Sequence, residues 1–424
     1  MSNKQPYAFI ISNAYGDKEW IYGNEFASLV VTAGYEPIGA LRQSVEIPNA
    51  ATYVGSGFLA KVKEYLEIIP QKWPEVTDLV VATDFDLTGT QRANIKKYLG
   101  VEVVDRTFII LKIFENNAHS KEAKLQVDIA TLYWSKNHLV NKEGAYSQVT
   151  SGGGMHNKGS GEKQISLDRR HINWLIDTKK KELDKIKQAR KNSRTKRNSS
   201  GIYKVAIVGY TNSGKSTLLN SLVAFCNGEK FVLTKDQQFA TLETATREIS
   251  KFGYMKFVAT DTVGFIRDLP TTLVDAFRST LEEIKEADLL VHVVDISSQS
   301  YQEEIDTTNK VLEEIGVKDI PSIYLFNKYD LLDKSLSSLL KENEMYCSLL
   351  DGEDIENIYR FICSSLSSGW KKVDIEFPFE QDFNQFSNDN YVTSFYKNKN
   401  GYQCTVYLNP RTLHKYSYLL DKNS

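Results

Sequence analysis

The sequence predicts a multidomain α/β protein, on three observations. The chain has 424 residues, a length that accommodates two to four domains of ordinary size. Short apolar runs alternate with helical patterns in two separate regions, which is typical of parallel sheets covered by helices. Two long helical patterns and a glycine-rich stretch stand between those regions, so the two sheets are expected to belong to different domains.

The first α/β domain is expected over residues 1–104. Apolar runs of strand length lie at 8–12, 36–43 and 79–82, and helical periodicity lies at 24–33, 57–69 and 90–98. This order of strands and helices favours a small parallel sheet.

Residues 105–200 are expected to form a helical hairpin followed by a basic linker. Apolar residues near 3.6 spacing predict one long helix over 105–134 and a second over 162–191. The stretch between them, 146–161, is rich in glycine and lacks apolar periodicity, which indicates an exposed loop. Two helices joined in this way form an antiparallel pair.

A third domain is expected over 201–369 and a fourth over 370–424. Buried strands are predicted at 204–208, 256–260, 289–294 and 322–326. The last block alternates aromatic and polar residues, which favours a small β-rich (α+β) domain.

The composition excludes several classes of protein. Hydrophobic residues make up 41% and charged residues 25% of the chain, which excludes a disordered or collagen-like polymer. No apolar run approaches the ~18 residues of a membrane helix, and the first twelve residues lack a secretory apolar region. We therefore expect a cytoplasmic protein with no membrane span. We also expect it to be a monomer, although no sequence pattern shows its oligomeric state. Its four scattered cysteines are expected to be free thiols; they are Cys226, Cys347, Cys363 and Cys404.

The charge is distributed unevenly. Residues 158–204 hold fifteen Lys or Arg against five acidic residues, a net charge of +10 in a chain whose total is −2. A basic segment in an otherwise acidic chain points to a polyanionic partner. A solvated helix face would have the same composition, so charge alone leaves both interpretations open.

The clearest motif reads GYTNSGKS, from Gly209 to Ser216, directly after the strand expected at 204–208. Its glycines let backbone N–H groups face phosphate oxygens, and the following helix points its positive end at the anion. Lys215 is expected to reach the β and γ phosphates, and Ser216 to supply a hydroxyl ligand to Mg²⁺.

Two further motifs follow later strands, in the expected order. Asp261-Thr-Val-Gly264 places a carboxylate where it can hold Mg²⁺ through water and an N–H where it can meet the γ phosphate. Asn327-Lys-Tyr-Asp330 places a carboxylate where it can accept both donors on one edge of guanine. Because ligands bind beyond the carboxyl ends of parallel strands, the three motifs together predict a GTPase domain.

Thr241 lies between the first two motifs and is the expected switch threonine, which would reach Mg²⁺ and the γ phosphate; Thr244 and Thr246 are the alternatives. Ser348 is expected in the loop that contacts the base. The residues expected to bind GTP are Gly209, Tyr210, Thr211, Asn212, Ser213, Gly214, Lys215, Ser216, Thr217, Phe239, Ala240, Thr241, Leu242, Glu243, Asp261, Thr262, Val263, Gly264, Asn327, Lys328, Tyr329, Asp330, Cys347, Ser348 and Leu349.

The expected catalytic residues are Lys215, Thr241, Gly264 and Asn212, and the expected Mg²⁺ ligands are Ser216 and Thr241. Phe265 occupies the position where a Gln could orient the attacking water, so hydrolysis by the isolated chain is expected to be slow. Asn212 is a candidate seat for a monovalent cation such as K⁺. A loop-stabilising role in a tight turn explains it equally well.

The sequence resembles the HflX-type GTPases. The similar stretches are GYTNSGKSTLLN, FATLETATR, residues 261–297, PNAATYVGSG, VVDRTFIILKIF, KLQVDIATL and the glycine-rich run ending at Arg170. The resemblance covers most of residues 20–370 and implies a cytoplasmic GTPase that binds the large ribosomal subunit and its rRNA, and that in several members separates stalled ribosomes under stress.

In that family the hairpin and its loop reach toward the peptidyl-transferase centre. The resemblance therefore suggests ribosome contacts at Gly152, Gly153, Gly154, Lys158, Lys179, Lys180, Lys181 and Arg190. The chain departs from the family pattern at Phe58, Lys158, Ser160, Lys163, Thr244, Ala245 and Leu349. The loop differences leave a housekeeping member and a divergent, antibiotic-related paralogue both open.

Three function classes follow from these patterns. The leading one is a GTP-driven ribosome factor that is released on hydrolysis. The second is a nucleotide-gated assembly or hibernation factor in which hydrolysis only resets binding. The third, an RNA-dependent ATPase using residues 1–104, has little support because that region contains no phosphate loop.

Overall fold

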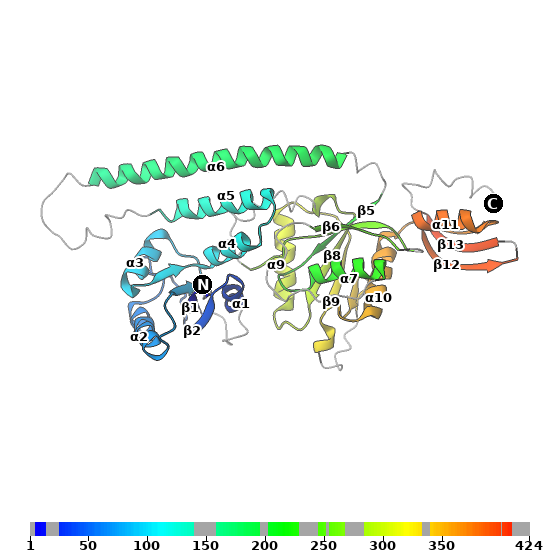
Figure 1. Cartoon of the computed structure of the whole chain (residues 1–424). Coiled ribbons are helices and arrows are strands. Elements are labelled where there is room, and N and C mark those ends of the chain that lie inside the picture. The colour runs from blue at the N-terminus through cyan, green and yellow to red at the C-terminus, as the bar shows by residue number, and fades with distance from the viewer. Residues whose placement is uncertain are drawn as a thin grey trace. The chain divides into compact units, whose positions relative to one another are not determined.

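The structure is a computed structural model that describes residues 5–13, 25–139, 158–195, 202–228, 245–251, 254–267, 284–332, 340–399 and 401–408. Side chains are described in these ranges except at 158–165, 190–195, 388 and 389. The chain divides into two compact units, one built mainly from residues 1–187 and the other mainly from residues 188–424 (Figure 1).

The first unit begins with a four-stranded parallel sheet in the order β2-β1-β3-β4. Its strands are β1 (Tyr7–Asn13), β2 (Glu36–Gln43), β3 (Leu79–Thr83) and β4 (Glu102–Val104), and its helices are α1 (Glu25–Thr32), α2 (Ser56–Lys72) and α3 (Gly89–Leu99). Phe9 and Val81 on the sheet pack with Leu59 and Ile95 from the helices. The predicted small α/β domain is confirmed.

The single helix expected over 105–134 is wrong. Two helices occupy the region, α4 (Arg106–Asn117) and α5 (Lys121–Asn137). Asp105 caps α4 by accepting from Phe108 N at 2.9 Å, and Ser120 caps α5 by accepting from Ala123 N at 3.1 Å. Each cap satisfies a backbone N–H that has no partner inside its helix. The apolar periodicity is nearly continuous across the break, because both helices bury one face.

The hairpin consists of α5 and α6 (Lys158–Thr195). Ile176 and Leu183 of α6 pack on Leu125 and Ile129 of α5, as the apolar spacing predicts. Residues 158–161, expected in the loop, are instead the first residues of α6. The rest of the expected loop, including Gly152, Gly153 and Gly154, lies outside the described residues.

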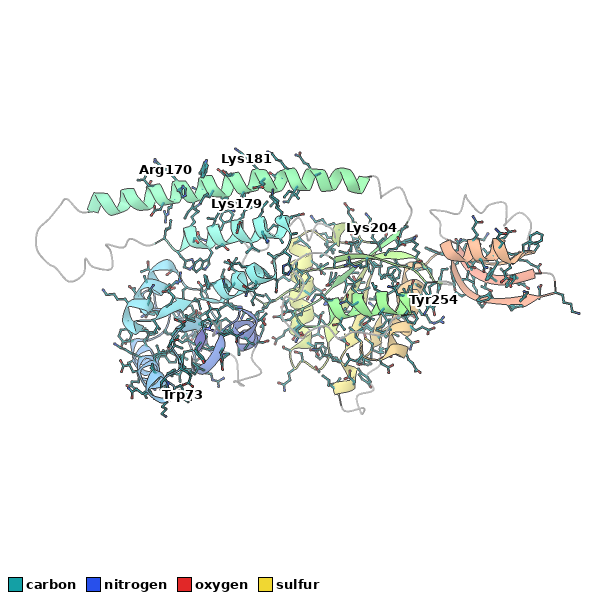
Figure 2. All side chains as sticks on the ribbon, viewed as in Figure 1. Trp73, Arg170, Lys179, Lys181, Lys204 and Tyr254 are labelled. Atoms are coloured by element: carbon teal, nitrogen blue, oxygen red, sulfur yellow. The ribbon has the colours of Figure 1, made fainter. Side chains whose placement is uncertain are left out.

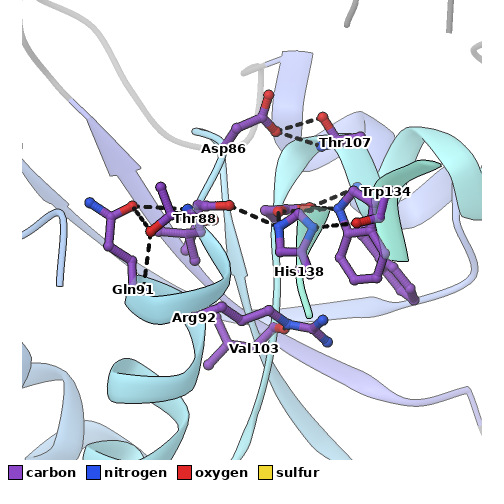
Figure 3. Close-up of polar contacts among 12 residues, drawn as sticks. Asp86, Thr88, Gln91, Arg92, Val103, Thr107, Trp134 and His138 are labelled. Carbon is purple, nitrogen blue, oxygen red and sulfur yellow. Dashed lines mark hydrogen bonds and ion pairs between the residues drawn. The ribbon is translucent and has the colours of Figure 1, made fainter. Parts of the chain in front are cut away.

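The half-buried side chain of His138 holds the end of α5 to the start of α4 (Figure 3). Its Nδ1 lies 2.7 Å from the Trp134 carbonyl, and its Nε2 lies 2.8 Å from the Leu87 carbonyl and 3.1 Å from Asp105 Oδ2. Burial lowers the pKa of its imidazole, but the contacts with Asp105 and the two carbonyls outweigh that effect and raise the pKa overall. Both ring nitrogens therefore face acceptors, which favours the protonated ring.

The second unit contains a six-stranded sheet in the order β10-β9-β8-β5-β7-β6, in which β6 pairs antiparallel and the other neighbours pair parallel. The strands are β5 (Tyr203–Val208), β6 (Ala245–Ile249), β7 (Phe257–Asp261), β8 (Leu289–Asp295), β9 (Ser322–Asn327) and β10 (Glu344–Tyr346). The four predicted strands are confirmed. The short, polar β6 and β10 were not predicted.

Helices cover both faces of this sheet. α7 (Lys215–Asn227) and α10 (Gly352–Leu366) pack in one cluster with Val205 and Val293, and α9 (Tyr301–Glu314) packs through Ile305 on Val294. Because Val293 and Val294 are adjacent in β8, the two helical layers lie on opposite faces. This is the doubly wound arrangement, whose ligand site lies beyond the carboxyl ends of the strands.

The chain ends in a three-stranded antiparallel sheet in the order β11-β13-β12, from strands β11 (Lys371–Phe377), β12 (Tyr391–Asn398) and β13 (Gly401–Leu408). Helix α11 (Glu380–Asp389) packs Phe383 and Phe386 on the face that carries Phe377 and Val406. The predicted β-rich (α+β) domain is confirmed, with one helix that aromatic alternation had not indicated. All four cysteines are free thiols, as expected. In the described part of the chain, no helix has the length and apolar character needed to cross a membrane.

Candidate functional site: the loops at the carboxyl ends of β5, β7 and β9

The loop between β5 and α7 requires glycine at two points. Gly209 has φ 147°, and a Cβ there would lie 2.3 Å from the Val293 carbonyl oxygen. Gly214 has φ 108°, and a Cβ there would lie 2.4 Å from Asn327 Nδ2. Neither position has room for a side chain, so the motif glycines let the loop lie against its neighbours.

Lys215 begins α7, and its side chain is only 6% exposed. Its Nζ donates to the Tyr210 carbonyl at 2.5 Å. Burial lowers the pKa of this ammonium to about 8, while the Asp261 carboxylate opposes part of the shift. A cation held inside a loop of backbone N–H groups is the arrangement that binds phosphate.

Two oxygen groups meet beside this lysine. Ser216 Oγ donates to Asp261 Oδ2 at 2.6 Å, and Asp261, at the end of β7, is 1% exposed. Hydroxyl and carboxylate oxygens are ligands that Mg²⁺ prefers, directly or through water. Thr262 Oγ1 donates to the Ile207 carbonyl at 2.7 Å, which fixes the backbone just after the carboxylate.

The segment after β7 lies on the P-loop. Phe265 N donates to the Gly209 carbonyl at 3.2 Å, and the Phe265 carbonyl accepts from Thr211 N at 2.8 Å. Arg267 N donates to Tyr210 Oη at 2.7 Å. The Phe265 ring is 1% exposed, so it is core rather than a group that faces solvent or a substrate.

Gly264, one residue earlier, lies against the same loop. A Cβ at Gly264 would come within 3.0 Å of Lys215 Nζ and of Thr211. The close approach explains the glycine of the D-x-x-G motif. It also places the Gly264 backbone beside the lysine that the sequence assigns to phosphate.

The third motif is tied to the P-loop by its asparagine. Asn327 Nδ2 donates to the Ser213 carbonyl at 2.8 Å, and Asn327 Oδ1 accepts from Leu349 N at 3.1 Å. Tyr329 N donates to the Cys347 carbonyl at 3.3 Å. The structure thus brings together the three loops that the sequence assigns to phosphate and base.

Two carboxylates bind residues of the base-side loops, and the sequence analysis did not predict either of them. Lys328 Nζ forms an ion pair with Asp295 Oδ2 at 2.7 Å, and Ser348 N donates to Asp354 Oδ2 at 2.7 Å. Asp295 ends β8 directly opposite Asn327. Its place at the end of a buried strand is the signal that could have identified it. Asp330 itself is exposed, as a base-contacting carboxylate must be before ligand binds.

Two buried hydroxyls of the P-loop, Thr211 Oγ1 and Ser213 Oγ, have no hydrogen-bond partner among the described residues. Buried polar atoms ordinarily have partners. Orphaned hydroxyls in a loop that also contains a buried ammonium fit a site that is completed by an oxygen-rich anion.

Several expected site residues cannot be placed. Residues 239–244, which include Thr241 and Thr244, lie outside the described part of the chain. Thr246 lies on β6, where its Oγ1 is 3.3 Å from Thr260 Oγ1 of the neighbouring strand. Of Lys158 and Arg190 only the helical backbone is described.

The doubly wound sheet, the P-loop with its buried lysine and the three assembled motifs define the class of protein: a P-loop GTPase. Family models match in chain order, "GTP-binding GTPase N-terminal" over 22–115, "GTP-binding GTPase Middle Region" over 117–197 and "50S ribosome-binding GTPase" over 204–328. The chain belongs to the HflX GTPase family, and it is an enzyme that hydrolyses GTP.

Two relatives illustrate the similarity. The chain is 40% identical over 358 residues to the GTPase HflX of Caldanaerobacter subterraneus subsp. tengcongensis, covering 84% of this chain and 80% of that protein. It is 34% identical over 356 residues to the GTPase HflX of Escherichia coli, covering 83% and 80%. Among solved structures, a GTP-binding protein from Sulfolobus solfataricus in complex with GDP aligns at TM-score 0.45 and 24% identity, covering 85% of this chain and 99% of that chain. GTPases of this family generally use Mg²⁺.

Proposed function

We propose that this chain is a GTP-driven factor that acts as a monomer in the cytoplasm, binds the large ribosomal subunit through its helical hairpin and separates stalled ribosomes. The observation that carries the proposal is that the basic residues on α6 fall into two groups, those that bond to α5 and those that point away from it. Lys179 Nζ bonds to Asp128 Oδ2 at 2.6 Å and Lys180 Nζ to Tyr133 Oη at 2.7 Å, so both hold α6 to α5. Arg170 and Lys181 project from the side of α6 opposite α5 (Figure 2).

The exposed pair supports the interpretation of the basic segment as a surface for a partner. Within the described residues, neither Arg170 nor Lys181 takes part in a hydrogen bond or ion pair. Cations that no carboxylate neutralises are available to phosphate. The "50S ribosome-binding GTPase" model that matches residues 204–328 supports ribosomal RNA as the source of that phosphate.

The nucleotide roles in this proposal follow the geometry of the loops. The P-loop N–H groups and Lys215 would hold the phosphates, and Asp330 with the backbone near Ser348 would hold guanine. Ser216 and Thr241 would ligate Mg²⁺ while Asp261 holds a metal-bound water. Bound there, the ion would neutralise charge on the β and γ phosphates. Asn212 is the proposed seat for K⁺.

The contact between Gly264 and the P-loop supports a nucleotide-dependent switch. A γ phosphate bound beside Lys215 would meet the Gly264 backbone directly. The same segment is bonded to Gly209 and Thr211 through Phe265, so a shift at Gly264 would rearrange the residues that follow it. Ordering of such segments by the γ phosphate is how GTPases commonly change their affinity for a partner.

Sedimentation of intact bacterial ribosomes with the purified chain and a non-hydrolysable GTP analogue tests the proposal. A splitting factor yields separated subunits before hydrolysis, and Lys215→Ala should yield none. Stable binding without separation would instead identify an assembly or hibernation factor. Absence of the chain from every ribosomal fraction would reject the proposal as a whole.

A charge-reversal pair tests the assigned surface. Arg170→Glu with Lys181→Glu should weaken subunit binding and reduce its salt dependence, because each lost phosphate contact lowers the number of counterions released. The melting temperature should remain unchanged. Lys179→Glu is the contrasting variant: it should destabilise the hairpin, since it places a second carboxylate next to Asp128.

A further inference from the structure

The outer face of α6 carries an exposed aromatic group that its packing on α5 does not require. Trp174 is 61% exposed and Leu167 is 56% exposed. Leu167, His171 and Trp174 are spaced four and three residues apart, so they share one side of the helix. The residues that pack on α5, among them Ile176 and Leu183, lie on the opposite side.

The two rings on this face are nearly parallel. The centroids of His171 and Trp174 lie 6.0 Å apart, with an angle of 23° between their planes. Together they form a flat, exposed surface. The exposed part of the indole contributes nothing to the stability of the chain, whereas a planar partner would bury its face.

The charge around Trp174 indicates what that partner is. Arg170, Lys181 and Lys185 share its side of the helix, and two acidic residues, Asp177 and Asp184, lie along its edge. Side chains at all five of these positions are exposed. The surface is therefore a planar aromatic group between cations one turn before it and two turns after it.

A second exposed tryptophan, Trp73, can be compared with Trp174. It is 44% exposed at the end of α2, in the same unit of the chain. Its near neighbours Lys72 and Glu75 are both exposed and carry opposite charges. Exposure of a tryptophan alone thus does not imply a nucleic-acid site, and cations on both sides along the helix are what distinguish Trp174.

We propose that Trp174 stacks on an unpaired base of ribosomal RNA while Arg170 and Lys181 contact the phosphates on either side of it. Proteins that hold single-stranded nucleic acid combine these two elements, since every base has a flat face and every linkage a negative charge. The proposal deepens the proposed function and rests on it, because it names the group that the hairpin contacts on the ribosome.

Stacking and charge neutralisation leave different signatures in a salt titration. Binding of large ribosomal subunits by the full chain with a GTP analogue is measured over a series of KCl concentrations. Trp174→Ala should lower the affinity by about tenfold at every concentration. The slope of log affinity against log salt should not change, because no phosphate contact is lost. Trp174→Phe should retain most of the affinity, and Trp73→Ala should match the unmodified chain.

A second measurement is independent of the ribosome. The chain has five tryptophans, so the difference in emission between the unmodified chain and Trp174→Phe isolates Trp174. A short single-stranded RNA should quench that difference signal. Double-stranded RNA of the same sequence should quench it much less, since its bases are already stacked.

The outcomes separate the two proposals. Failure of the unmodified chain to bind subunits, with quenching by single-stranded RNA intact, would reject the ribosomal function and keep the stacking surface. Subunit binding by Trp174→Ala at full strength would reject the stacking alone. Weaker subunit binding by Trp174→Ala without any quenching by RNA would show that the tryptophan contacts a ribosomal protein, and the proposal would be wrong.

Discussion

The side-chain amide of Asn327 donates to the carbonyl of Ser213 over 2.8 Å, which joins the end of β9 to a P-loop residue 114 positions earlier in the chain. Its other amide atom accepts from Leu349 N. One buried side chain therefore sets the spacing between the loop assigned to phosphate and the loop assigned to the base.

Asn327→Ala should lower both stability and GTP affinity. It leaves the Leu349 N–H and the Ser213 carbonyl without their partner, at a cost of about 1–3 kcal/mol in the free energy of unfolding. Chemical denaturation without nucleotide and GTP titration measure the two effects. Asn343→Ala is the matched control, because Asn343 Nδ2 also donates to a backbone carbonyl, that of Ser322, at 3.1 Å. It should lose stability only; equal GTP affinity in both variants would contradict the bridging role.

Asp330→Asn should change the choice of base. The carboxylate accepts two donors of guanine, whereas an amide presents a donor of its own, so GTP affinity should fall by about 2–4 kcal/mol. Xanthosine triphosphate, which has a carbonyl in place of the amino group, should then bind better than GTP. Titration of both nucleotides against both proteins checks this. Unchanged GTP binding would show that Asp330 does not contact the base.

Lys215→Met should abolish tight binding of the triphosphate and stabilise the nucleotide-free chain. The unmodified protein buries an ammonium at 6% exposure, and desolvation of that charge costs free energy until an anion is present. Thermal melting without nucleotide should therefore occur at a higher temperature in the variant. Added GTP should raise the melting temperature of the unmodified protein alone. A large drop in the melting temperature of the nucleotide-free variant would mean that the lysine is structural.

Turnover by the isolated protein should be slow and should rise by about tenfold or more with large ribosomal subunits. The buried ring of Phe265 cannot orient water, so another group must complete the site. Steady-state phosphate release with and without subunits measures the difference. Fast turnover by the protein alone would point to a catalytic group within the chain that these motifs do not contain.

The proposed role of Asn212 in seating K⁺ can be tested separately from its role in the turn. Its φ of 64° is in the left-handed region, which glycine adopts without strain. Asn212→Gly therefore removes the amide and keeps the backbone, whereas Asn212→Ala adds strain of about 1 kcal/mol. If the amide seats the cation, K⁺ should exceed Na⁺ in rate for the unmodified protein and not for Asn212→Gly. If the residue only shapes the turn, Asn212→Gly should keep the difference.

The contacts of His138 at the base of the hairpin should contribute less to the stability of the folded chain as the pH rises. The pKa of His138 is raised in the folded chain by Asp105 and two carbonyls, against the opposing effect of burial. Its contribution is fully present below the unfolded pKa of about 6.5 and is lost as the pH rises through the higher folded value. His138→Gln should remove this part of the pH dependence, measured by denaturation from about pH 5 to 8. The exposed His171→Gln is the control. The same slope in His138→Gln and the unmodified chain would assign the dependence to other groups.

The sequence was a good guide to the nucleotide site and a poorer guide to the hairpin. The site could be predicted because each motif is a short contiguous run after a buried strand, so position along the chain implies position in space. The helix break before Ser120 was missed because α4 and α5 both bury one face, and apolar periodicity does not register a change of direction between two buried helices.

By itself the sequence determined that this chain is a GTPase with a basic hairpin, since the residue types and their spacing carry both facts. Only the tertiary structure decided which basic residues are available. Lys179, Lys180 and Lys181 are consecutive, yet the first two hold α6 to α5 and the third faces away. Successive residues on a helix are turned by about 100° from one another. Only the position of the partner helix decides which of them face that helix and which face solvent.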